Sequence, residues 1–206
     1  MCSIVGSFNI ETLCNLSQLN AYRGTHSHSL YAFDRDMNVS YSHKGFGALD
    51  VSAHTIPKDC YIVAHQQAPT TEAKDMNSIH PADAENSLLW HNGIIKQDDV
   101  RRLQYELNTN EKWDTKLLLL NYIATGSFES INGTFACVMH TSNKLHILRN
   151  EISPLFMNAV GDVSSTKFDD SFSIHPNKLL HFNPFDDTMI RVIGTFTTKE
   201  NPYFFG

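Results

Sequence analysis

Cys2 is the residue of this chain whose type and position could most directly do chemistry. Once Met1 is removed, Cys2 carries a free α-amine beside its thiol. An α-amine has a reference pKa of about 8, so part of it is unprotonated near neutral pH and can act as a base. The thiolate is the attacking species, and a neighbouring base raises its population. A single residue could therefore supply both the nucleophile and its base.

The dipeptide Asn92-Gly93 is the second candidate for chemistry. Its side-chain amide and backbone N–H could both donate to a developing oxyanion, and one such donor is worth roughly 3–4 kcal/mol of barrier. The alternative is an ordinary Asn-Gly turn that ends a strand over residues 88–91.

The order of several short motifs resembles the class II glutamine amidotransferases. That family includes the glutaminase domains of glucosamine-6-phosphate synthase, the purine amidophosphoribosyltransferase and asparagine synthetase B. The resemblance covers nearly the whole chain, and its most specific part is His-Asn-Gly-Ile-Ile after a strand. The motifs are Cys2-Ser-Ile-Val-Gly, Arg23-Gly24, His65 before a Pro- and Thr-containing loop, residues 91–95, and shorter matches at 78–81, 113–115, 133–136 and 149–155.

The resemblance implies an α+β fold, the four-layer αββα sandwich of the N-terminal-nucleophile hydrolases. It also implies that residues 1–206 are a single glutaminase domain without a synthase domain. Cys2 would attack the side-chain amide of glutamine, with the oxyanion held by Asn92 and Gly93. Ammonia would leave, and water would hydrolyse the γ-glutamyl thioester without any cofactor. A separate synthase or acceptor subunit would then receive the ammonia.

Three further residues take substrate-binding roles from the resemblance. Asp114 would pair with the α-ammonium group of glutamine, Thr70 and its loop would bind the α-carboxylate, and Arg23 would lie beside the nucleophile. Each has an ordinary alternative: helix capping for Asp114, a turn for Thr70 and the surface for Arg23.

Gln67 is the main departure from the family, because it stands where an arginine normally holds the α-carboxylate. Glutamine donates hydrogen bonds but brings no charge and no bidentate fork. Further departures are Thr25 and His26 after Arg23-Gly24, Lys96-Gln97 after the 91–95 motif, and Lys116. Two alternatives follow: an amidase for another small amide, or a non-catalytic module that regulates a partner synthase. A retained Met1 would favour the module.

Short strands dominate the elements that must position these residues. Alternation and turn residues predict strands at 3–8, 29–33, 61–65, 88–91, 134–140, 144–149, 155–159, 179–182 and 189–194. Residues 98–107 and 114–123 are predicted to be helices, and residues 11–22 have near-helical apolar spacing. A loop is expected at 23–28, and a long one, typical of functional segments, at 66–83.

The composition is that of an ordinary globular protein. The 206 residues are 41% hydrophobic and 18% charged, with a formal net charge of −6. An acidic balance argues against nucleic-acid binding, which depends mainly on Lys and Arg. The N-terminal residues lack the pattern of an export signal, and no apolar run approaches a membrane span.

The cysteines and histidines show no metal-binding spacing. Cys2, Cys14, Cys60 and Cys137 form no Cys-x-x-Cys pair, so a reduced, cytoplasmic setting is expected, with Cys137 in the core. The 11 histidines are scattered along the chain without a helical His-x-x-x-His pair. We therefore expect no metal site.

Overall fold

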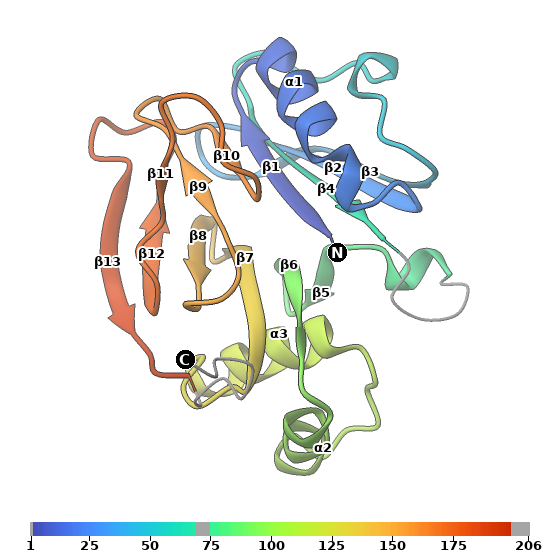
Figure 1. Cartoon of the computed structure of the whole chain (residues 1–206), viewed down its shortest axis with the longest axis vertical. Helices are drawn as coiled ribbons and strands as arrows, with labels where there is room; N and C mark the ends of the chain where they lie inside the picture. Colours follow the sequence, from blue (N-terminus) through green and yellow to red (C-terminus); the bar gives the residue numbers. More distant parts are fainter. Residues whose placement is uncertain (1, 69–74, 199–206) are drawn as a thin grey trace.

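The strands form two antiparallel sheets in the computed structural model, which describes residues 2–68 and 75–198 (Figure 1). Sheet A consists of β1 (Ser3–Ser7), β2 (Ser27–Phe33), β3 (Val39–Phe46), β4 (Tyr61–Gln67), β9 (Phe156–Met157), β10 (Val163–Ser164) and β11 (Phe172–Ser173). Its order is β11-β9-β10-β1-β4-β2-β3. Sheet B consists of β5 (Ala82–Ala84), β6 (Ser87–Ile95), β7 (Gly133–Thr141), β8 (Lys144–Arg149), β12 (Lys178–Phe182) and β13 (Ile190–Thr195). Its order is β13-β12-β8-β7-β6-β5.

The helices cover the outer faces of the two sheets. They are α1 (Ile10–Asn20), α2 (Gln97–Glu106) and α3 (Asp114–Thr125), with short 3-10 turns η1 (Ala21–Arg23), η2 (Val51–Ala53) and η3 (Met76–Ser78). The side chain of Asn9 starts α1 by accepting a hydrogen bond from the backbone N–H of Thr12 at 2.9 Å. Gly126, in the left-handed conformation, ends α3.

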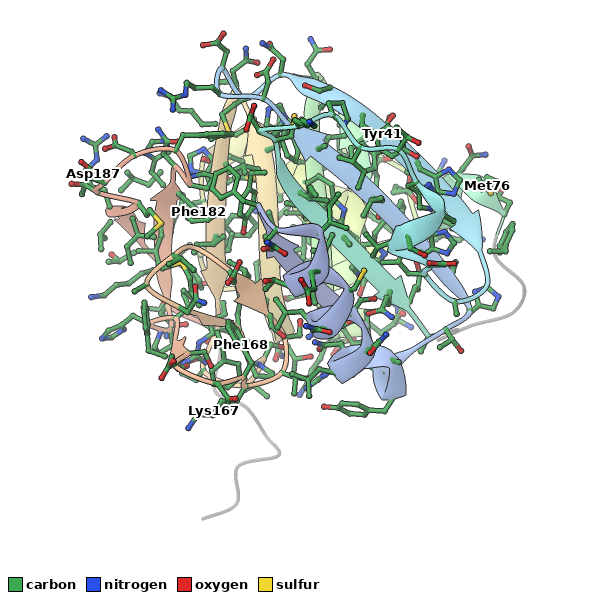
Figure 2. The ribbon with its side chains drawn as sticks, turned by 90° about the horizontal axis from the view of Figure 1, so that it is seen from above. Tyr41, Met76, Lys167, Phe168, Phe182 and Asp187 are labelled. Carbon is green, nitrogen blue, oxygen red and sulfur yellow. The ribbon has the colours of Figure 1, made fainter. Side chains whose placement is uncertain are left out.

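Two-residue alternation builds three apolar layers from the same strands. Ile4 and Trp90 belong to the core between the sheets, whereas Val5, next to Ile4, packs with Leu13 of α1. On the far face of sheet B, Phe135 packs with the leucines of α3. Figure 2 looks onto α1 lying across sheet A. This αββα stacking confirms the predicted fold class.

The second half of β6 differs from the sequence-based expectation. Asn92-Gly93 is not a turn, because β6 continues through both residues to Ile95 and pairs with β7, Asn92 opposite Ala136 and Gly93 opposite Phe135. A Cβ on Gly93 would approach the carbonyl oxygen of Thr134 to 1.9 Å, so the glycine permits close strand contact. The dipeptide is thereby fixed in the middle of a sheet.

The predicted loop at 66–83 is shorter than expected. Strand β4 extends to Gln67, and η3 and β5 occupy part of the remainder. None of the helices in the described part of the chain is both long and apolar enough to cross a membrane.

Candidate active site

Cys2 lies in a pocket of about 600 Å³ where the start of β1, the end of β4, β6 and the start of α3 meet. The residue is 8% exposed. Ser3 pairs with Gln66, and this antiparallel register brings Cys2 next to Gln67. The pocket is lined by Cys2, Gln67, Asp75, Ser78, His80, His91, Gly93, Ile94, Ile95, Gln97, Val100, Lys112, Trp113, Asp114 and Thr115. Four of the seven predicted site residues, Cys2, Gln67, Gly93 and Asp114, therefore share one pocket.

Asn92 is buried beside this pocket and is connected to the start of β1. Its Nδ2 donates to the Ser165 hydroxyl at 3.3 Å, and the same hydroxyl accepts the backbone N–H of Ile4 at 2.9 Å. A side-chain amide nitrogen has two hydrogens, so a second donor remains on Asn92. Ser165 thus connects the Asn92 amide to the backbone of Ile4, two residues after Cys2. No motif in the sequence marked Ser165.

Arg23 is not part of the pocket lining in the described structure. Its Nε donates to the Thr166 hydroxyl at 3.0 Å and its Nη2 to the Ser165 carbonyl at 3.3 Å. This placement favours a positioning role, through the segment that holds Asn92, over the expected contact with substrate. Thr70 lies outside the described residues.

Asp114 is the first residue of α3, so it does not cap the helix in the usual sense. One carboxylate oxygen accepts the N–H of Thr115 at 2.8 Å, and the other accepts the N–H of Ile95 at 3.1 Å. The positive end of the helix favours a carboxylate at this place. The chain thereby holds a fixed anion on the wall of the pocket.

A buried hydrogen-bonded network runs along the wall of the pocket, starting at Gln67. Gln67 Oε1 lies 3.2 Å from His80 Nδ1, and His80 Nε2 lies 3.0 Å from the Thr115 hydroxyl. That hydroxyl is 3.1 Å from His91 Nδ1, and His91 Nε2 is 3.2 Å from the Thr134 carbonyl oxygen. The sequence marked His80, Thr115 and His91 as parts of motifs but gave them no joint role.

The hydrogen bonds of this network need more hydrogens than two neutral imidazoles and one hydroxyl supply. Both ends are acceptors, because Gln67 Nε2 donates to the Ser78 carbonyl at 3.5 Å and so leaves Oε1 facing His80. Between Gln67 and Thr134 four gaps each need one hydrogen, whereas one from each neutral ring and one from the Thr115 hydroxyl make three. The Thr115 hydroxyl also lies 3.4 Å from Asp114 Oδ1, a longer contact that would draw on the same hydrogen. One added proton completes the network. In the other orientation of the Gln67 amide, Nε2 would donate to His80 Nδ1 and the network would be complete with neutral rings, with Oε1 3.5 Å from the Ser78 carbonyl oxygen.

His80 is the natural place for that proton. Burial lowers the pKa of His91, and the Asp114 charge and the bond to Thr134 only partly oppose this. A neutral His91 donates from Nε2 to Thr134 and accepts the Thr115 hydroxyl at Nδ1. Thr115 then accepts from His80, whose other nitrogen faces Gln67 Oε1. With the Gln67 amide in this orientation, a proton on both nitrogens of His80 would complete the network.

Comparison with known proteins finds similar structures but no similar sequences. No protein-family model and no curated protein sequence matches the chain. Among solved structures, the glutamine phosphoribosylpyrophosphate amidotransferase from B. subtilis, complexed with ADP and GMP, superposes with a TM-score of 0.69 at 16% identity. A structure described as the allosteric regulatory enzyme of purine biosynthesis superposes with a TM-score of 0.70 at 18% identity. Both matches cover 93% of this chain.

The chain has the fold of the matched region of these two structures, an α+β sandwich of two antiparallel sheets. It spans about half the length of the two matched proteins, 48% of each. At 16–18% identity the likeness shows the fold alone, and function depends on the residues of the pocket.

Proposed function

We propose that this chain is a glutaminase of the class II glutamine amidotransferase type, with Cys2 as its nucleophile. The observation that carries the proposal is the convergence of Cys2, Gly93 and Asp114 on one pocket, from three separate elements. A thiol at the start of the sheet, backbone donors on β6 and a carboxylate at a helix start are the parts that amide cleavage needs.

The proposed reaction begins when the α-amine of Cys2 takes the thiol proton. The thiolate attacks the amide carbon of the substrate, and the carbonyl oxygen becomes an oxyanion. The backbone N–H of Gly93 and the second Nδ2 hydrogen of Asn92 donate to this oxyanion. The C–N bond breaks, and the ammonium formed at Cys2 returns the proton so that ammonia leaves. Water then hydrolyses the thioester to release glutamate and the thiol.

The two charged groups on the α-carbon of glutamine would meet two neighbouring groups of the pocket. The Asp114 carboxylate suits the α-ammonium group, and the protonated His80, facing Gln67, suits the α-carboxylate. His80 would thus supply the positive charge that arginine supplies in the family. Thr70 keeps its expected contact with the carboxylate as a proposal. The ammonia acceptor is proposed to be a separate polypeptide in the cytoplasm.

The second candidate is an amidase for a small amide that lacks an α-carboxylate. Gln67 favours it, because this fully buried residue is neutral where the family has a cation. Hydrolysis of glutamine and of simple primary amides should be compared on the same preparation, with labelling of Cys2 by a glutamine-analogue electrophile. Turnover of glutamine well above that of the simple amides supports the glutaminase, and the reverse order supports the amidase. If neither is cleaved with Met1 removed and candidate synthases present, the non-catalytic module is the better account.

His80→Gln should raise the KM for glutamine by roughly 10-fold or more near neutral pH and below, with a smaller change in kcat. The reason is that the variant removes the proposed charge on His80, which acts on the α-carboxylate through space because both of its N–H groups are donated to Gln67 and Thr115. The wild-type KM should rise with pH as the network loses its proton, and His80→Gln should remove most of that dependence. The charged or titratable groups around His80 are His65 stacked on it, His91 and Asp114 through Thr115, Lys44 on the flanking carbonyls, and Cys2, Asp75 and Lys112 in the pocket. A KM that is independent of pH in the wild type would contradict the protonated network.

Gln67→Arg should lower the KM for glutamine, and most clearly at high pH. There the wild-type network has lost its proton, whereas arginine keeps its charge. At low pH the new cation repels the proton on His80, so little net charge is gained. KM should be measured across pH for both forms, with an amide lacking an α-carboxylate as the control substrate. An unchanged KM alongside good wild-type turnover would mean that the carboxylate lies elsewhere.

A further inference from the structure

Three histidines from separate segments converge on the outer face of sheet A. His28 lies in β2, His43 in β3 and His54 directly after η2, and one ring nitrogen from each lies within 4.8 Å of the others. No other group of three or more His, Cys, Asp or Glu ligand atoms comes as close within the described residues. We name His28, His43 and His54 the three-histidine cluster. The sequence-based expectation of no metal site rested on the spacing of the histidines along the chain, which does not show that these three lie together in space.

The cluster is separate from the pocket that contains Cys2. His28 and Leu30 point to the same face of β2, and Leu30 packs in the core beneath α1. Ser29, on the opposite face, accepts a hydrogen bond from Trp90 between the sheets. Tyr41, labelled in Figure 2, marks the face of β3 that carries the cluster. None of its three histidines lines the pocket.

Each flanking contact leaves a nitrogen available for a ligand. His28 Nδ1 lies 3.1 Å from the Gly47 carbonyl oxygen, to which it can only donate, so its Nε2 carries a lone pair when the ring is neutral. His54 Nδ1 is 2.8 Å from the Tyr41 hydroxyl, which leaves its Nε2 facing outward from that bond. Histidines that bind metals usually hold their second nitrogen on such a carbonyl, carboxylate or hydroxyl.

Gly45 leaves the space between the rings empty. A Cβ at this position would lie 3.0 Å from His28 Nε2 and 3.0 Å from His43 Nε2. Both nitrogens therefore border the volume that any larger residue would fill. The ring centroids of His28 and His43 are 5.4 Å apart and those of His43 and His54 are 4.5 Å apart.

A carboxylate also lies near the edge of the cluster. The carboxylate of Asp50 lies near enough to His54 for their charges to interact. Three imidazoles with a carboxylate at their edge are a donor set that suits a divalent cation.

We propose that the three-histidine cluster binds a Zn²⁺ ion, with a water molecule in the fourth position. Zinc bound tetrahedrally at 2.0–2.1 Å requires neighbouring nitrogens about 3.3 Å apart, so the rings close in by rotation of the half-exposed His43 and His54. The ion would join the β2–β3 hairpin to η2. Its binding is independent of the glutaminase chemistry, because the two sites lie on opposite faces of sheet A.

The test uses metal-free full-length protein that carries Cys2→Ser, so that the pocket thiol does not bind zinc. Titration with Co²⁺ should give the visible absorption of a tetrahedral site, and one equivalent of Zn²⁺ should remove it. At a hundredfold excess over Kd, Zn²⁺ should raise Tm by roughly 5–10 °C.

Matched variants locate the metal. His43→Gln and His54→Gln should each weaken Zn²⁺ binding by at least about 10- to 100-fold, because even the loss of a contact that supports a ligand lowers metal affinity by that factor. Gly45→Ala should weaken it too, while keeping all three histidines. His175→Gln removes an exposed histidine elsewhere and should change nothing. Equal binding by His43→Gln, Gly45→Ala and the parent protein, or no Zn²⁺ binding by the parent, would overturn the proposal. Matching Tm values of the metal-free forms exclude a folding defect.

Discussion

Cys2→Ser should lower glutamine hydrolysis by roughly a thousandfold or more, since removal of a catalytic nucleophile costs that much in comparable enzymes. An alcohol is far less ionised than a thiol near neutral pH, and the α-amine is too weak a base to compensate. Among the described residues, Cys2 is the one cysteine that lines the pocket. Turnover should be measured by ammonia release, with the intact mass confirming that Met1 is absent.

The other cysteines provide the controls for this prediction. Cys14→Ser should leave turnover unchanged, because burial and the charges of Asp50 and Glu11 raise the pKa of its thiol and keep it unreactive. Cys60 and Cys137 are buried in apolar cores, so their serine variants should lose stability instead of chemistry. Near-normal turnover of Cys2→Ser, together with a dead variant at one of these positions, would refute the assignment. An active enzyme that retains Met1 would refute the α-amine as base.

The strands that alternate between two buried faces were predictable from the sequence. Residues 3–8, 61–65 and 134–140 read as strands because every second side chain packs in one core and the rest in another. Strand β3 was missed because it is an edge strand with largely exposed polar residues, such as Ser40 and Ser42. Strands β10 and β11, of two residues each, are too short to show a period.

The site was predictable only where a motif is local. The motif singled out Asn92-Gly93, but the conformation of this dipeptide was misjudged, because the contact that makes it a strand comes from Thr134 on the next strand. Ser165 holds Asn92 from 73 positions away, and no local pattern reports such a pair. The three-histidine cluster likewise depends on the register of β2 with β3 and on the path of the chain through η2.

Asn92→Ala should lower kcat by roughly a hundred- to thousandfold while changing the KM for glutamine little. The second hydrogen on Nδ2 is expected to meet the substrate oxygen strongly only once that oxygen has become an anion. The loss therefore falls on the transition state and not on binding. The variant removes a buried amide whose partner is the Ser165 hydroxyl, so its fold should be checked by thermal denaturation.

Ser165→Ala is the control that separates donation from positioning. It keeps the Asn92 amide but removes the hydroxyl that accepts from it and from the N–H of Ile4. We expect a smaller fall in kcat, roughly tenfold or less, because the amide is still present but less firmly oriented. In the double variant the serine change should cost almost nothing further, since the group that it orients is gone. Additive losses would mean that Ser165 acts through Ile4 and Cys2 instead, and a raised KM with an unchanged kcat in Asn92→Ala would make Asn92 a ground-state contact.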